Sequence, residues 1–137
     1  MKIKYFTALF SVMFLLAFTV IGAQDRVLIK PGTKNWLDTN MYFTCDFVKK
    51  PVLGVSVLRL QVFDKTGSRN NDFKITALSG MPGMRMHDTE ETNIKQNKKG
   101  DYLYPIDVVM PGNWEIKINV YKKQANVFPG VIKFEVK

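Results

Sequence analysis

The sequence predicts an all-β protein: an immunoglobulin-like antiparallel sandwich of two sheets with about seven strands, preceded by an N-terminal signal peptide helix. Three observations carry this prediction. Apolar and polar residues alternate with a period of two through most of the chain after residue 40. Proline, glycine, asparagine and aspartate cluster between the alternating runs. No helical period of 3.6 residues lasts three turns beyond the N-terminal segment.

The N-terminal segment differs in composition from the rest of the chain. Lys2 and Lys4 give it a basic start, residues 5–23 carry no charge, and Ala23 precedes a plausible cleavage point. This pattern is typical of a secretory signal peptide, here residues 1–23. The uncharged run is nearly as long as the roughly 20 residues that span a bilayer, so a retained membrane anchor is the alternative. Both predict a periplasmic or other extracytoplasmic location for residues 24–137.

Residues 24–137 have the length of one domain. Its strand patterns fall, in chain order, at residues 42–47, 55–63, 73–77, 102–110, 114–121 and 132–136. The clearest run places Trp114, Ile116, Ile118 and Val120 on one face, with polar residues on the other. Trp114 is expected to anchor the core. The breaks include residues 64–67, 97–101, 111–112 and 128–130, which are expected to form turns.

The scarcity of cysteine and histidine limits the chemistry open to the chain. Cys45 and His87 are the only residues of their types. An internal disulfide, a cysteine-cluster metal site and a multi-histidine site are therefore excluded within one chain. The sequence also contains no phosphate-binding glycine loop and no nucleophile elbow. We therefore expect a non-enzymatic protein in which Cys45 is a buried core residue.

The charge is strongly positive but scattered. Twenty lysines and arginines oppose twelve aspartates and glutamates, a formal charge of +8, which falls to +6 if the signal segment with its two lysines is removed. The lysine pairs lie beside turn signals and are not interleaved with aromatic residues, so no nucleic-acid partner is predicted. A weak attraction to anionic membrane surfaces remains open.

A methionine-rich segment interrupts the strand pattern. Met81, Met84 and Met86 fall within six residues, and His87 follows directly. Thioether sulfur is a soft ligand that prefers Cu(I) and does not form disulfides, and imidazole also binds copper. Met110, which ends a strand pattern, is a candidate to close the site from a neighbouring loop. The segment therefore predicts a copper site made by Met81, Met84, Met86, His87 and Met110.

Two alternatives remain open for this segment. Methionine also fills irregular gaps in apolar cores, so some of these side chains can be packing residues. The segment can also be an apolar contact surface for a protein partner. The acidic residues that follow, Asp88, Glu90 and Glu91, are too few for a hard-cation site and predict a solvated loop.

The order of three short motifs resembles a known family. A loop at Met81-Pro82-Gly83-Met84 is followed by Gly100-Asp101-Tyr102 and then by Met110-Pro111-Gly112-Asn113-Trp114. Over residues 54–121 this order resembles the FixH-like and YtkA-like extracytoplasmic domains. The resemblance implies an immunoglobulin-like sandwich at the bacterial cell envelope and a part in copper handling, including copper supply to respiratory oxidases. Fold and function are separate inferences, since one fold hosts many functions.

The sequence thus leads to two hypotheses. The first is a small non-enzymatic copper-binding or copper-shuttling protein, with Cu(I) as the preferred ion. The second is a metal-free structural or adaptor sandwich that docks on a membrane or envelope protein partner. The two differ in whether the methionine sulfurs converge on one point.

Overall fold

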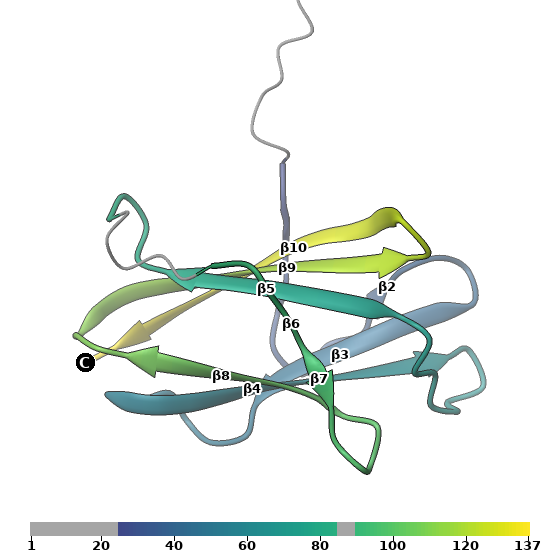
Figure 1. Cartoon of the computed structure of the whole chain (residues 1–137), viewed down its shortest axis with the longest axis horizontal. Helices are drawn as coiled ribbons and strands as arrows, with labels where there is room; N and C mark the ends of the chain where they lie inside the picture. The colour runs from purple at the N-terminus through teal and green to yellow at the C-terminus, as the bar shows by residue number, and fades with distance from the viewer. Residues whose placement is uncertain (1–24, 85–89) are drawn as a thin grey trace, which may run out of the picture.

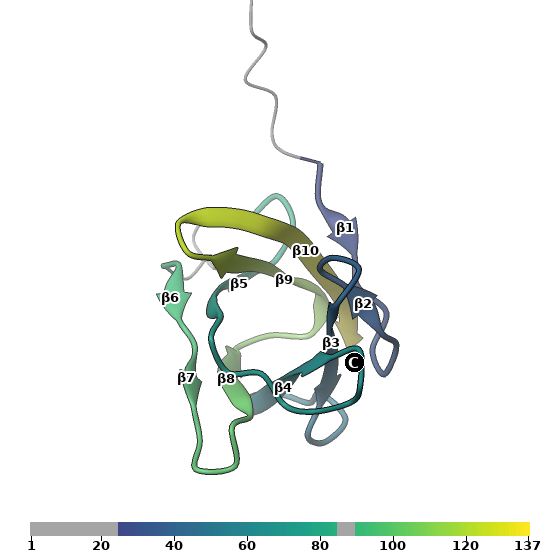
Figure 2. The same ribbon diagram turned by 90° about the vertical axis from the view of Figure 1, so that its right-hand side faces the viewer.

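Two five-stranded sheets face each other in the computed structural model of this chain (Figures 1 and 2). The structure describes residues 25–84 and 90–137. The predicted signal segment, Met86 and His87 lie outside the described residues. Within the described part every regular element is a strand, so the predicted all-β sandwich is confirmed.

The sheets are mostly antiparallel, and only β1 pairs with its neighbour β10 in parallel. The first sheet has the order β1-β10-β9-β5-β6, with β1 (Val27–Leu28), β10 (Ala125–Val136), β9 (Gly112–Lys122), β5 (Lys74–Gly80) and β6 (Thr92–Asn93). The second has the order β2-β3-β4-β8-β7, with β2 (Asn35–Trp36), β3 (Met41–Phe47), β4 (Gly54–Asp64), β8 (Tyr102–Val108) and β7 (Lys95–Gln96).

This strand order is that of an immunoglobulin-like domain. In chain order β3, β4, β5, β7, β8, β9 and β10 correspond to strands A to G, without the additional edge strand β6. The sheet β3-β4-β8-β7 then has the A-B-E-D order, and β5-β9-β10 has the C-F-G order. The chain crosses between the sheets after β4, as it does after β8, so the two layers are tied together by Greek-key connections.

The core lies between the sheets and is built by alternation. Along β4, Ser56, Leu58, Leu60 and Val62 are buried while the residues between them are less so. Along β9, the predicted set beginning at Trp114 is buried throughout. Hydrogen bonds also cross between the layers, among them the one that the hydroxyl of Tyr102 donates to the carbonyl of Phe73 at 2.9 Å. The two inward faces therefore share one apolar interior.

The last strand is longer than the sequence pattern predicts. Residues 128–130, expected to form a turn, lie inside β10, where Pro129 is paired with Asn119. The register shifts between Asn126 and Phe128, and an irregularity of this kind accommodates a proline that cannot donate to the ladder. Gly130 leaves room for Ile29, because a Cβ at residue 130 would lie 2.4 Å from the Ile29 Cδ1 atom. The turn prediction was wrong here because this local signal was overridden by packing.

Four of the strands have only two residues, and of these the sequence indicates only the one that starts at Thr92. β1 and β2 precede the first long strand, and β6 and β7 run between β5 and β8. Each is too short for a period of two to be visible in sequence. They extend the edges of the two sheets and bring the count to ten strands among the described residues.

The core position Val62 and the surface position Val55 provide a matched test on one strand. Val62 is fully buried, whereas Val55 is 69% exposed. We expect Val62→Ala to lower the free energy of unfolding by about 1.5–3 kcal/mol through lost burial and a residual cavity. The Val55→Ala control should change it by less than about 0.5 kcal/mol. Urea denaturation measures both, and equal losses would contradict the assigned inward face of β4.

Candidate functional site

The described methionines of the predicted site lie at one end of the sandwich, which we call the methionine end. Here β5 ends, β8 turns into β9, and β10 finishes (Figure 1). Met81 directly follows β5, and Met110 lies in the turn between β8 and β9. The pairing of Gly80 with Glu115 lays the end of β5 beside the start of β9. Residues far apart in sequence are thereby brought to the same end.

Met81 is seated over a glycine at this end. A Cβ atom on residue 112 would lie only 2.7 Å from the Met81 methyl carbon. Gly112 also has a φ of +131°, a conformation that residues with a side chain rarely adopt. Glycine at 112 therefore serves both the turn and the close approach of Met81. Met81 is half-buried and packs against the core.

Met110 is held by the buried indole of Trp114. The indole N–H of Trp114 donates to the Met110 carbonyl at 3.0 Å, and Trp114 is only 2% exposed. This bond closes the turn between the two sheets, in the place where immunoglobulin-like domains often use a tyrosine hydroxyl. The expected role of Trp114 as a core anchor is confirmed. The Met110 side chain is partly buried against the core.

Met84 is the most exposed of the three residues. Its backbone N–H donates to the Met81 carbonyl at 3.1 Å across a tight turn in which Gly83 has a φ of +77°. The side chain of Met84 is 41% exposed. The structure therefore brings Met81 and Met110 to one end as partly packed residues and sets Met84 one turn away, facing solvent.

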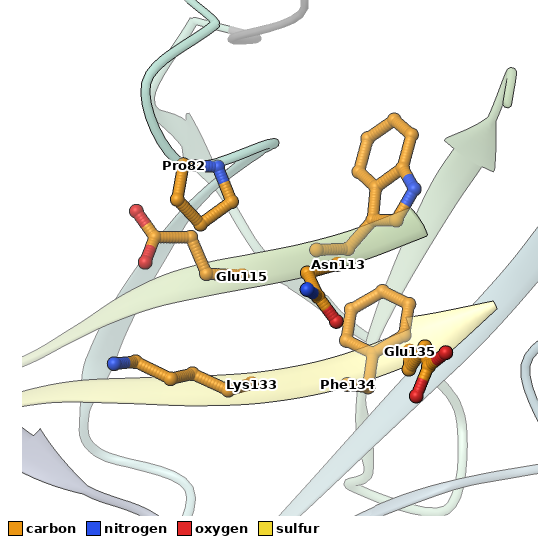
Figure 3. Close-up of a pocket in the computed structure, with 7 residues that line it drawn as sticks. Pro82, Asn113, Glu115, Lys133, Phe134 and Glu135 are labelled. Carbon is orange, nitrogen blue, oxygen red and sulfur yellow. The ribbon is translucent and has the colours of Figure 1, made fainter. Parts of the chain in front are cut away.

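A groove of about 460 Å³ lies beside this site (Figure 3). It is lined by Pro82, Asn113, Trp114, Glu115, Lys133, Phe134 and Glu135. Figure 3 shows Pro82 near Glu115 of β9, and Lys133 and Glu135 on β10. The lining mixes both signs of charge with two aromatic rings, so it has no strong preference for an ion of one sign.

A polar cluster that the sequence did not predict holds the C-terminal end of the methionine segment. Glu91 accepts hydrogen bonds from the Thr76 hydroxyl and from the Asn119 amide, the latter at 3.1 Å. Arg26 donates to the Asn119 side-chain oxygen at 3.0 Å. Thr76 and Asn119 are 5% and 7% exposed although they are polar. Sequence spacing could not reveal this cluster, because its members come from four separate segments.

The hydrogen bond from Thr76, followed by that from Asn119, lowers the pKa of Glu91 below its ordinary value of 4.5. Glu91 is exposed and lies outside any strand, as the predicted solvated loop requires, and its carboxylate is also tied to β5 and β9. The chain leaves β5 at Gly80 and is fastened again at Glu91. Both ends of the methionine segment are therefore attached to the same pair of strands.

Cys45 lies in the interior, as predicted. It is fully buried in β3. Burial, and then the nearby charge of Asp46, raises the pKa of its thiol. A thiol in this state is a poor nucleophile and a poor metal ligand at neutral pH.

The described residues lack two kinds of feature. Residues 25–84 and 90–137 contain no group of three His, Cys, Asp or Glu side chains placed to hold a metal ion. The same ranges contain no helix of the length and apolar character that crossing a membrane requires.

No protein-family model matches the sequence, and no curated protein matches it significantly.

The contact between Met81 and Gly112 can be tested by a double-mutant cycle. We expect Gly112→Ala to destabilise the fold by about 1–3 kcal/mol, from backbone strain and from collision with Met81. Removing the Met81 side chain relieves the collision, so Met81→Ala/Gly112→Ala should be more stable than the sum of the single changes. Gly54→Ala is the control, since Gly54 has a positive φ but no neighbour within 4 Å. Strict additivity in thermal or urea unfolding would contradict this packing.

The Glu91 cluster predicts a pH dependence. Because the pKa of Glu91 is lowered in the folded state, its ionised form stabilises the fold above the ordinary value of 4.5. That stabilisation is lost as the pH falls through the lowered pKa. We expect Glu91→Gln to flatten the dependence of unfolding free energy on pH in the acidic range. Glu90→Gln leaves the hydrogen bonds of Glu91 in place and is the matched control. Identical pH profiles for the two variants would show that Glu91 has no such role.

Proposed function

We propose that this chain is a small, non-enzymatic, extracytoplasmic copper-binding protein that carries Cu(I) at its methionine end. The observation that carries the proposal is that three methionine residues belong to the connections at one end of the sandwich. Met81 and Met110 come from different connections, and the solvent-facing Met84 lies one turn from Met81. Thioether sulfur is a ligand type suited to Cu(I) and unsuited to magnesium, calcium or zinc.

The proposed ligand set combines described and undescribed residues. Met84 is the proposed first ligand because it has the largest exposed fraction of the three. Met81 and Met110, which are partly buried, are candidates to complete the site. Met86 and His87 join the set on the sequence pattern, since they follow Met84 directly and supply a thioether and an imidazole. A set of thioethers with one imidazole leaves the ion free of strong anionic ligands, which favours transfer to an acceptor over permanent storage.

Two further features support a carrier over an enzyme. The two described ends of the methionine segment are fastened to the sandwich, Gly80 by strand pairing and Glu91 by hydrogen bonds. The only thiol is buried and the only histidine lies in the methionine segment. Copper delivery to an envelope or membrane partner, as the resemblance to FixH-like and YtkA-like domains implies, belongs to the same proposal.

A competition titration against a coloured Cu(I) chelator, under reducing and anaerobic conditions, tests the proposal. We expect the wild-type chain to withdraw Cu(I) and Met84→Leu/Met86→Leu to lose at least about tenfold in affinity, because ligands are removed at nearly constant side-chain volume. The control is Met41→Leu. Met41 lies at the start of β3, beside Asp64 at the other end of the sandwich.

Two outcomes would overturn the proposal. If the double variant competes as well as the wild type, the ligands are elsewhere. If the folded wild-type chain withdraws no copper, the metal-free adaptor is the better hypothesis. Circular dichroism on each variant shows whether the sandwich is intact, so loss of copper is separated from loss of fold.

A further inference from the structure

We propose that the methionine end also docks on a bilayer that contains anionic lipids, through the loop of residues 48–53 together with Val55 and Val109. This inference is independent of the copper proposal. It rests on where the exposed apolar side chains lie, how the loop is held, and which charges stand beside it.

Exposed apolar side chains concentrate at this end. Nine large hydrophobic residues in the described part of the chain are exposed, and six of them lie here: Val48, Val52, Leu53, Val55, Met84 and Val109. The other three belong to the N-terminal strands β1 and β2. Single exposed apolar residues are common on soluble proteins, but a cluster at one end marks a contact surface.

Five of these six residues belong to strands or connections of the second sheet, and only Met84 does not. Val48 follows β3, and Val52 and Leu53 precede β4. Gly54 at the start of β4 is paired with Val108 at the end of β8, so Val109 lies alongside the same edge. Val48, Val52 and Val55 also line one shallow hollow with the two lysines of the loop.

The loop is held in shape by buried polar contacts. The Ser56 hydroxyl, 6% exposed, donates to the Val52 carbonyl at 3.2 Å and accepts from the Val52 N–H at 3.3 Å. The Val48 N–H donates to the Val57 carbonyl at 2.9 Å, which closes the base of the loop. The exposure of Val52 and Leu53, at 55% and 51%, therefore belongs to a constrained loop that projects them outward.

The charges beside the cluster fit an anionic surface. Lys49 and Lys50 are exposed within the loop, which contains no acidic residue. Asp46, the acid nearest along the chain, is paired with Arg59 at 3.0 Å. Two acidic residues lie near the loop. Asp107 is paired with Val55 across the sheet. Glu135 lines a hollow together with Lys50 and Lys137. The protruding loop itself is thus apolar and cationic.

This arrangement matches the structure of a lipid interface. Apolar side chains of a protruding loop can enter the boundary between headgroups and acyl chains while neighbouring lysines reach the phosphates. A lysine near an anionic membrane surface strengthens binding about fivefold. A protein partner would more often be met by aromatic residues and arginine at the centre of the interface, and the loop contains neither.

A local fluorescent probe tests docking in the full-length chain. Val52→Cys is labelled with an environment-sensitive dye and mixed with vesicles of phosphatidylcholine alone or of equal parts phosphatidylcholine and phosphatidylglycerol. Cys45 is fully buried, so the unmodified chain serves as the unlabelled control. The matched control is Lys98→Cys, in the exposed turn before β8 at the opposite end. Because the N-terminal segment is present in both, membrane attachment through it cannot mimic the difference.

We expect a blue shift at position 52 on the anionic vesicles, a smaller one on neutral vesicles, and none at position 98. Adding Lys49→Gln and Lys50→Gln should lower the ratio of docked to undocked probe about 25-fold, as two lysines contribute about fivefold each. Val109→Cys gives a second reporter if labelling at 52 disturbs the loop. The proposal would be overturned if neither position 52 nor position 109 shifted, or if position 98 shifted as much as they do. It would also be overturned if replacing the two lysines left the shift on anionic vesicles unchanged.

Discussion

The hydrogen bond from the Trp114 indole to the Met110 carbonyl is the contact on which the methionine end depends. It joins the turn between the sheets to a core side chain that is only 2% exposed, so movement of the turn would break a hydrogen bond of a buried indole. The same turn contains Gly112, whose missing side chain accepts the Met81 methyl group. Trp114 thereby holds the turn between β8 and β9, against which Met81 of the connection after β5 packs.

The two ends of the sandwich differ in chemistry because their connections differ. At the end opposite the methionine end, turns are stabilised by their own polar side chains. The Asp64 carboxylate accepts from the Thr66 and Ser68 N–H groups, and the Asn97 amide oxygen accepts from those of Lys99 and Asp101. Such turns need no partner. The methionine end instead presents apolar side chains that its own turns do not cover.

The sequence predicted what is local and periodic. Alternation along residues 55–63 and 114–121 identified the inward faces correctly, because burial of one sheet face imposes a period of two. It missed short strands such as β1, and it predicted a turn at Pro129 that lies inside β10. Both errors come from long-range contacts, namely the parallel pairing of β1 with β10 and the packing of Ile29 against Gly130. The Glu91 cluster was hidden for the same reason, as Thr76 and Asn119 are 43 residues apart.

The site was predictable in its residue types and less so in its geometry. Thioether clustering could be read from residues 81–86, but the unequal exposure of Met81 and Met84 follows from Gly112 and the tight turn at Gly83. The two proposed roles occupy different layers of one end, with Met81 and Met84 continuing the β5 sheet and loop 48–53 belonging to the β4 sheet. Val109 and Met110 stand between them on the turn that joins the layers. The proposed bilayer contact and the proposed thioether site therefore use different connections at the same end of the sandwich.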